Sequence, residues 1–166
     1  MIEPGQRVPD ASLQEYVQTE GPGCSIGPRK LQVLDELRGK RVVVFGLPGA
    51  FTPTCSAQHV PGYLEQHDAL VAAGVAEIWC VSVNDAFVMG AWARDQGTEG
   101  KIRMLADGGA EWTRALGLDA EIPGMGVRSR RYSMLIEDGT VRSLNLEEAG
   151  KFEVSDAATM LGQLRA

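Results

Sequence analysis

Apolar residues follow two different spacings along this chain of 166 residues. Two runs, 41–47 and 77–83, are almost continuously apolar and rich in β-branched residues. Strands that are covered on both faces have this composition, so each run predicts a buried strand. The segments that follow, from 55 to about 73 and from 86 to about 94, repeat apolar residues every three to four positions, which predicts helices.

Weaker patterns predict the smaller elements. Residues 11–17 alternate between polar and apolar, which predicts an edge strand, and Pro61-Gly62 should kink or break the long helix. The other expected elements are helical turns with Leu31, Leu34 and Leu37 that end at Gly39, a cap at Asn84-Asp85 before a helix with Phe87, Val88, Ala91 and Trp92 at core spacing, a strand at 102–105, a short helix with Trp112, Ala115 and Leu116, a hairpin of 132–137 and 141–146 around Asp138-Gly139, and a last helix capped by Ser155 with Ala158, Leu161 and Leu164 along one stripe.

The order of these elements predicts the fold class. Strand–helix units followed by a hairpin and a final helix indicate an α/β fold, in which a mixed central sheet carries helices on both faces. No internal repeat, low-complexity tract or linker interrupts the pattern, so residues 1–166 are expected to form one domain.

Composition narrows the function classes. Apolar residues make up 44% of the chain and charged residues 23%, which is ordinary for a soluble globular protein. A net charge of −6 argues against a nucleic-acid surface. Three cysteines without framework spacing argue against a disulfide-stapled secreted domain, and no apolar run is long enough to span a membrane. The first residues lack a leader pattern, so a reducing cytoplasm is the expected compartment.

The stretch from Pro48 to Cys55 is the strongest candidate site. It joins a predicted strand to a predicted helix, and the free N–H groups and dipole of a helix start favour negative charge. A cysteine in that first turn should ionise more easily than a free thiol. Thr52 stands where a Cys-x-x-Cys motif would carry its first cysteine, so the site predicts a lone activated thiol rather than a dithiol exchanger.

The same stretch resembles a known family. Pro48, Thr52 and Cys55 fill the pattern Pro-x-x-x-Thr-x-x-Cys, which is the active-site signature of the peroxiredoxins. The wider string from Pro48 to Ser56 is similar to the type II, peroxiredoxin-5-like branch. The resemblance continues through His59-Val60-Pro61-Gly62, 81–88, 105–108 and 128–134, and so covers nearly the whole chain.

This resemblance implies a thioredoxin-like fold and a set of catalytic roles. Cys55 would be the peroxidatic thiolate, Thr52 would hydrogen-bond it and the peroxide, and Pro48 would shield it from water. Arg131 matches the active-site arginine of the family. Its guanidinium fork would suit both a thiolate and a peroxide oxygen. A solvated basic patch is the expectation for Arg128 and Arg130.

Two further side chains remain open between a chemical and a structural role. Cys80 follows Cys55 by 25 positions, a spacing similar to plant-type and bacterial members with a second, resolving cysteine. It also lies inside an apolar strand, where a cysteine is an ordinary small hydrophobe. His59 could act as a base or increase the thiolate content, but a structural role beside Pro61 is the preferred interpretation. Cys24 lies in a Gly- and Pro-rich loop and is expected to be an incidental surface thiol.

The function implied by the resemblance is a thiol peroxidase that reduces hydrogen peroxide or alkyl hydroperoxides. Its sulfenic acid would be resolved by Cys80 or an external thiol and then reduced by glutaredoxin/glutathione or thioredoxin. No metal or organic cofactor is expected. The chain is expected to form a non-covalent homodimer. The alternative is a peroxide sensor or redox relay that uses the same Cys55 without steady turnover; a dithiol oxidoreductase is a weaker third option.

Overall fold

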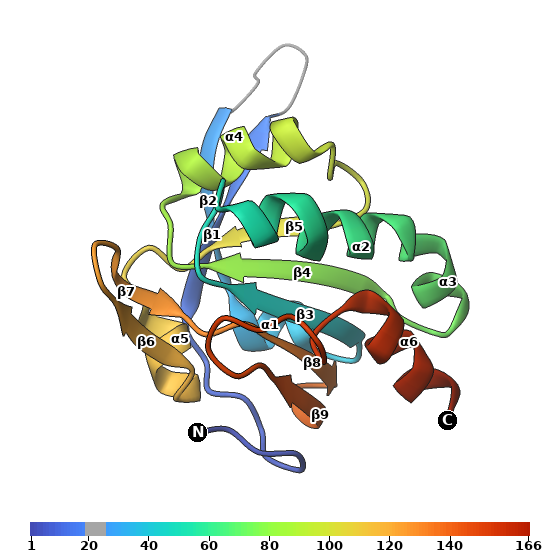
Figure 1. Cartoon of the computed structure of the whole chain (residues 1–166). Helices are drawn as coiled ribbons and strands as arrows, with labels where there is room; N and C mark the ends of the chain where they lie inside the picture. Colours follow the sequence, from blue (N-terminus) through green and yellow to red (C-terminus); the bar gives the residue numbers. More distant parts are fainter. Residues whose placement is uncertain (19–25) are drawn as a thin grey trace.

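The computed structural model describes residues 1–18 and 26–166, so the prediction for Cys24 falls outside the described residues. Within these ranges, seven strands form one mixed sheet in the order β2-β1-β5-β4-β3-β8-β9 (Figure 1). Strands β3, β4 and β5 are parallel, and the remaining pairs are antiparallel. The strands are β1 (Ser12–Gln18), β2 (Ile26–Gln32), β3 (Arg41–Leu47), β4 (Glu77–Ser82), β5 (Arg103–Ala106), β8 (Tyr132–Glu137) and β9 (Thr140–Leu146).

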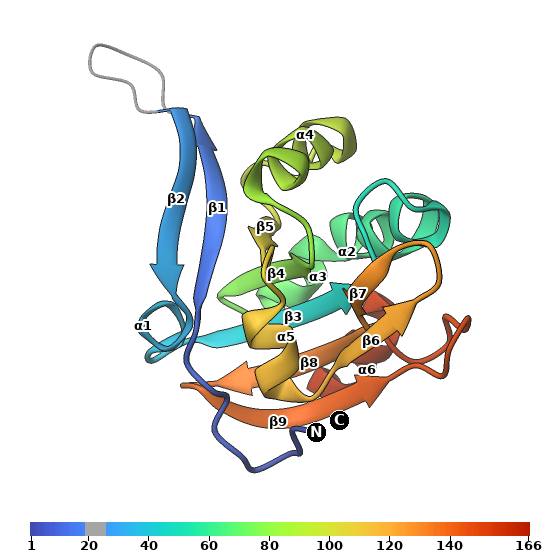
Figure 2. The same ribbon diagram turned by 90° about the vertical axis from the view of Figure 1, so that its left-hand side faces the viewer.

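Helices cover both faces of the sheet, as the sequence predicts. One face carries η1 (Cys55–His59), α2 (Val60–Glu65), α3 (His67–Ala72), α4 (Ala86–Gln96) and α6 (Ala157–Arg165), and the other carries α1 (Val33–Leu37) and α5 (Glu111–Leu116). In Figure 2, α5 lies in front of the sheet, and the small hairpin of β6 (Asp119–Ile122) and β7 (Gly126–Ser129) lies beside it. The sequence pattern missed this hairpin.

Strand β3 shows why a continuous apolar run is needed at the centre. Val43, Phe45 and Leu47 belong to the core on the α2–α4 side, while Val42 and Val44 belong to the core under α1 and α5. All five are fully buried, because helices cover both faces of the sheet and β3 pairs with β4 on one side and β8 on the other. The predicted strand at 41–47 is confirmed with the same bounds.

Three local predictions are wrong. Strand β1 is not an edge strand, because it pairs with both β2 and β5. The interruption of the long helix falls at Gln66 rather than at Pro61-Gly62, and Pro61 lies in the first turn of α2. Helix α6 is capped by Asp156, whose carboxylate accepts from the Thr159 N–H, and not by Ser155.

Two helices also present a different face to the core than predicted. Phe87 of α4 is 64% exposed, whereas Met89 and Gly90 are buried. A Cβ on Gly90 would lie 2.7 Å from the Tyr16 ring, so the close approach of β1 selects this face. In α6, Met160 is buried in place of Ala158, which is exposed.

Candidate active site

The loop after β3 brings the predicted nucleophile to the start of a helix. The helix begins at Pro53, a position where the missing proline N–H costs no hydrogen bond. The loop is fixed from the neighbouring strand, since the Ala50 N–H donates to Asn84 Oδ1 at 3.0 Å. Phe51 has a φ of +65°, so the turn is tight at the residue before Thr52.

Cys55 lies in the first turn of this helix and is buried. From Cys55 to His59 the turn is a π-helix, in which the Val60 N–H donates to the Cys55 carbonyl. Pro61 follows directly and has no N–H for the regular helical bond, so the wide turn takes the place of the predicted kink. One-turn π segments occur often at functional sites.

Arg131, immediately before β8, reaches the sulfur. Its Nη2 donates to Cys55 Sγ at 3.2 Å, and its Nη1 donates to His59 Nδ1 at 2.9 Å. The guanidinium also lies over the Phe152 ring, 5.8 Å from the centroid. Of the three arginines that the sequence offered, this is the one with a contact to the sulfur.

Arg128 and Arg130 have other positions. Arg128 is not a solvated patch residue, because its guanidinium donates to the carbonyls of Val83 and Met125 at 3.0 and 3.1 Å and so ties the β6–β7 hairpin to the end of β4. Arg130 lines the cavity beside the site but makes no described contact with the sulfur.

His59 is buried between Arg131 and the loop before α6. Its Nε2 lies 3.0 Å from the Ser155 carbonyl oxygen. Burial, then the charge of Arg131, lower the pKa of His59 to about 3, against an opposing hydrogen bond to Ser155. The ring is therefore neutral near pH 7, which favours the structural interpretation over a base that takes up the thiol proton.

Thr52 and Pro48 belong to the loop that leads to Cys55, but the threonine contact differs from the prediction. The Thr52 hydroxyl donates to the Gly49 carbonyl at 2.8 Å, and the Ser56 N–H donates to the Thr52 carbonyl at 3.0 Å. A hydroxyl has one proton, so in this conformation it stabilises the loop and would have to rotate to donate to the thiolate.

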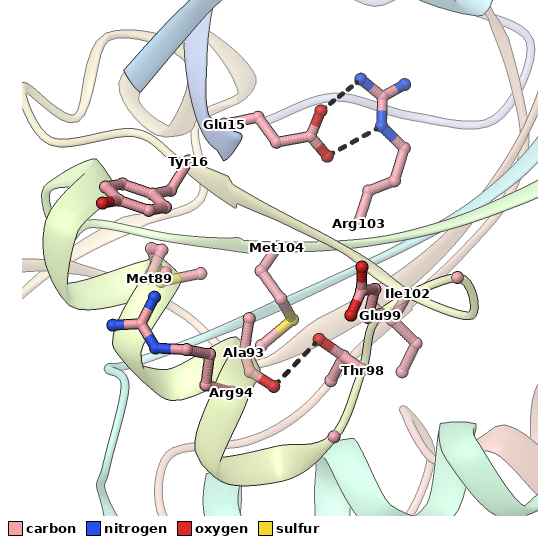
Figure 3. A pocket seen from close by; sticks show the side chains of 13 residues that line it. Glu15, Tyr16, Met89, Ala93, Arg94, Thr98, Glu99, Ile102, Arg103 and Met104 are labelled. Atoms are coloured by element: carbon pink, nitrogen blue, oxygen red, sulfur yellow. Dashed lines mark hydrogen bonds and ion pairs between the residues drawn. The ribbon is translucent and has the colours of Figure 1, made fainter. Parts of the chain in front are cut away.

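A cavity of about 650 Å³ opens beside this cluster. Pro48 and Arg131 line it on the side of the active-site loop, and Ile122, Pro123 and Phe152 give it an apolar wall. A second cavity, of about 420 Å³, lies between α4 and strands β1 and β5 and is lined by Tyr16, Met89, Met104 and Arg94 among others (Figure 3). It contains none of the predicted catalytic residues.

Cys80 lies in the same core as Cys55, in the middle of β4 between Phe45 of β3 and Met104 of β5. Burial raises the pKa of the Cys80 thiol well above its usual range, the nearby Cys55 raises it further, and Arg131 opposes the shift. Both described cysteines are free thiols. In the described part of the chain, no three His, Cys, Asp or Glu side chains gather as a metal site, and no helix is long and apolar enough to cross a membrane.

Comparison with known proteins identifies the family. The Redoxin family model matches residues 3–161. Peroxiredoxin-2C from Oryza sativa is 49% identical over 165 residues, which cover 96% of each chain. The chain is a peroxiredoxin of the Redoxin family. Its plant, cyanobacterial and peroxiredoxin-5 relatives agree with the type II branch, and the peroxiredoxin is accordingly a thiol-dependent peroxidase with a thioredoxin-like fold.

Solved structures support the same assignment for this peroxiredoxin. Reduced Prx3 from Vibrio vulnificus in complex with H₂O₂ is 47% identical, with a TM-score of 0.92 and 99% of each chain covered. The oxidised form of that protein gives a TM-score of 0.87. A Burkholderia cenocepacia structure, described as a candidate thioredoxin reductase, is 60% identical with a TM-score of 0.94 and covers 98% of this chain and 97% of its own. That description differs from the others, and Thr52 leaves the peroxiredoxin without the Cys-x-x-Cys pair of a dithiol exchanger.

Sequence reasoning missed the residues that support the site from the C-terminal region. Glu147, Phe152 and Ser155 contact or brace His59 and Arg131. They come from a loop with no regular periodicity and no motif, so no local signal could have placed them at the thiol.

Proposed function

We propose that Cys55 is the peroxidatic nucleophile and that Arg131 stabilises its anion. The thiolate sulfur attacks one peroxide oxygen, an S–O bond forms, and the O–O bond breaks. The electron pair of the O–O bond leaves with the second oxygen, which takes a proton from solvent and departs as water or an alcohol. The sulfur is oxidised by two electrons to sulfenic acid, and the peroxide is reduced. The observation that carries this proposal is the 3.2 Å contact between Arg131 Nη2 and Cys55 Sγ.

The same guanidinium is suited to the departing oxygen. A donor fixed before the reaction stabilises developing negative charge without reorganisation. Arg131 is held by His59 and lies against Phe152, so its fork has a fixed orientation. Pro48 supplies packing at the loop, and Thr52 donates a second hydrogen bond once its hydroxyl turns from Gly49 to the sulfur.

The substrates we propose are hydrogen peroxide and alkyl hydroperoxides. Hydrogen peroxide alone would need little space, whereas the cavity beside Arg131 has a volume of about 650 Å³ and an apolar wall. Such a wall can take the alkyl group of an organic hydroperoxide. Rates with hydrogen peroxide and with cumene hydroperoxide, measured on the same preparation, test this point, and a lack of any reaction with the organic peroxide would contradict it.

For the return to the thiol, we propose that the Cys80 sulfur attacks the Cys55 sulfenic acid, so that an S–S bond forms, the S–O bond breaks and the oxygen leaves as water with the Cys80 proton. Glutaredoxin/glutathione or thioredoxin then reduces this disulfide. Both sulfurs belong to one core, and the nearby Cys55 contributes to the raised pKa of Cys80. Bond formation requires the first turns of the helix to unwind, since the strand cysteine is held between β3 and β5. The lower similarity to the oxidised Vibrio form than to the reduced form supports a change of shape on oxidation.

We also propose that the protein resides in a reducing cytoplasm and that it forms a homodimer through the face beside the active-site loop. Phe51 and Phe87 are 53% and 64% exposed, and both lie near α4, where Phe51 approaches Trp92 and Phe87 approaches Tyr16. Exposed aromatic side chains of this kind are typical of protein interfaces. Sedimentation of the wild type against a Phe51→Ser/Phe87→Ser double variant tests it, and equal masses for both proteins would refute it.

Mass spectrometry of the peroxide-treated protein and a coupled peroxidase assay test the main proposal. Steady NADPH consumption with glutaredoxin, glutathione and glutathione reductase, lost in Cys55→Ser, is the expected result. Retained turnover in Cys55→Ser would refute Cys55 as the nucleophile. A mass loss of two hydrogens in the treated wild type, absent in Cys80→Ser, would support the disulfide.

A further inference from the structure

The two terminal nitrogens of the Arg131 guanidinium donate to different acceptors. One of them, Nη2, meets the Cys55 sulfur, and the other, Nη1, meets His59 Nδ1. An arginine can only donate, so Nδ1 of His59 must accept and carries no proton. The proton of the neutral ring is therefore on Nε2, and it is donated to the Ser155 carbonyl.

The Ser155 carbonyl thus fixes the form of the histidine that can hold the arginine. It accepts from His59 Nε2 at 3.0 Å and from the Tyr63 hydroxyl at 3.1 Å, so two side chains of the active-site helix converge on one oxygen. A carbonyl can only accept, and it stabilises the protonated nitrogen on its own side of the ring. If this oxygen moved away, neither the tautomer nor the ring orientation would be fixed.

Glu147 holds that carbonyl in place. Its Oε2 accepts from three successive backbone N–H groups, those of residues 153, 154 and 155, at 2.8, 2.9 and 2.9 Å, and from the Ser155 hydroxyl at 2.7 Å. Burial alone would raise the pKa of Glu147, but the hydrogen bonds from Ser155, Val154 and Glu153 hold it below its usual range. The carboxylate is therefore charged near pH 7 and closes the loop around itself.

Glu147 also makes a backbone hydrogen bond to Arg131 itself. Its backbone N–H donates to the Arg131 carbonyl at 3.0 Å, just before β8. One residue thus binds the backbone of Arg131 and, through its side chain, the loop that orients the histidine. The path from the carboxylate to the sulfur runs through Ser155, His59 and Arg131 without a gap.

We propose that Glu147 is a positioning residue for the peroxidase reaction, acting through Ser155 and a neutral His59 to keep the Arg131 guanidinium on the Cys55 sulfur. This inference rests on Cys55 as the nucleophile. It assigns His59 the role of a hydrogen-bond acceptor for arginine rather than that of a base.

The first test compares two buried carboxylates. Glu147→Gln keeps the shape but removes the charge that holds the loop, and we expect the second-order rate with peroxide and the thiolate content at neutral pH each to fall, the rate by about tenfold, as for loss of one well-placed hydrogen bond. The matched control is Asp107→Asn. Asp107 is also buried and holds the Trp112 and Thr113 N–H groups. It should lose stability without this loss of reactivity.

The second test uses two substitutions of the histidine. In His59→Asn the amide oxygen can still accept near the Nδ1 position, whereas His59→Gln places its amide near Nε2 and leaves Arg131 without its partner. We expect both variants to lose rate, since His59→Asn keeps an acceptor for Arg131 but not the hydrogen bond to Ser155, and we expect His59→Gln to lose clearly more. The reverse order, or equal rates for both, would overturn the acceptor role.

A measurement on the unaltered protein covers the case in which Glu147→Gln does not fold. Ring nitrogen chemical shifts of His59 should show a proton on Nε2 and none on Nδ1 throughout neutral pH. A charged imidazolium, or a proton on Nδ1, would overturn the proposal. Failure of Cys55 as the nucleophile would appear separately, as peroxidase turnover retained in Cys55→Ser.

Discussion

Replacement of Arg131 by methionine removes the cation from the thiolate while leaving most of the apolar bulk of the side chain. The structure shows one direct contact to the sulfur, from Nη2 at 3.2 Å, and a second contact, from Nη1, that goes to His59. A hydrogen bond to a charged group contributes about 1.5–3 kcal/mol. We therefore expect the second-order rate with hydrogen peroxide to fall by about 10- to 150-fold.

The assay follows from a nearby tryptophan. Trp92 Nε1 donates to the Ser56 hydroxyl at 3.1 Å, next to Cys55 in the chain, so its fluorescence should report oxidation of the sulfur. Stopped-flow traces at several peroxide concentrations give the rate constant directly. The thiolate content, measured by ultraviolet absorbance at fixed pH, should fall together with the rate.

Two comparisons make the Arg131 result decisive. Arg131→Lys keeps the charge but not the fork, so it should fall between the wild type and Arg131→Met. Arg142→Met removes an equal charge from the surface of β9, where the arginine pairs with Glu137, and should leave the rate unchanged. Equal losses in Arg131→Met and Arg142→Met would show that only the overall field matters. An unchanged rate in Arg131→Met would refute the mechanism.

The remaining predictions concern the thiols and the buried histidine. Cys55→Ser should abolish peroxide reduction, as read from residual peroxide over time. Cys80→Ser should still reduce one equivalent of peroxide but should accumulate sulfenic acid, which a dimedone adduct would reveal by mass; a disulfide mass in this variant would contradict the assignment. The pKa of His59 is lowered to about 3 in the folded protein. Below about pH 6.5 the unfolded chain therefore binds a proton on this ring, whereas the folded chain does not. The wild type should accordingly lose about 2 kcal/mol of unfolding free energy as the pH falls from 6.5 to about 5. Urea titrations at both pH values should show a smaller loss in His59→Leu, and an equal loss would show that the ring is charged in the folded state.

The sequence predicts the site best where the signal is local. The apolar run 41–47, the proline at the helix start and the position of Cys55 are consecutive in the chain, and each acts through its neighbours. The hairpin at Asp138-Gly139 is predicted for the same reason, since both residues have positive φ, as a tight two-residue turn requires. Arg131 could be placed at the sulfur only through the resemblance to a family, because no local rule connects residues 76 positions apart.

The predictions that failed depend on contacts between distant segments. Close packing of Tyr16 against Gly90 determines which face of α4 points inward. The sequence around each residue gives no indication of this contact. Serine is a common helix-capping residue, but the Ser155 hydroxyl donates to the Glu147 carboxylate, and the neighbouring Asp156 caps the helix. The Thr52 hydroxyl is predicted to donate to the sulfur, but in the folded loop the Gly49 carbonyl accepts from it at 2.8 Å.

The wide turn between Cys55 and His59 contains one residue more than a regular helical turn would need. The segment after it is anchored, because the Tyr63 ring stacks on Phe45 with centroids 4.2 Å apart. Deletion of a single residue from positions 56–58 would restore ordinary helical spacing, and the whole rotation, about 100° per residue, would fall on the part of the helix that precedes the deletion. The sulfur would then turn away from its guanidinium although every catalytic side chain were still present, so insertions and deletions at this turn should be far less tolerated than substitutions.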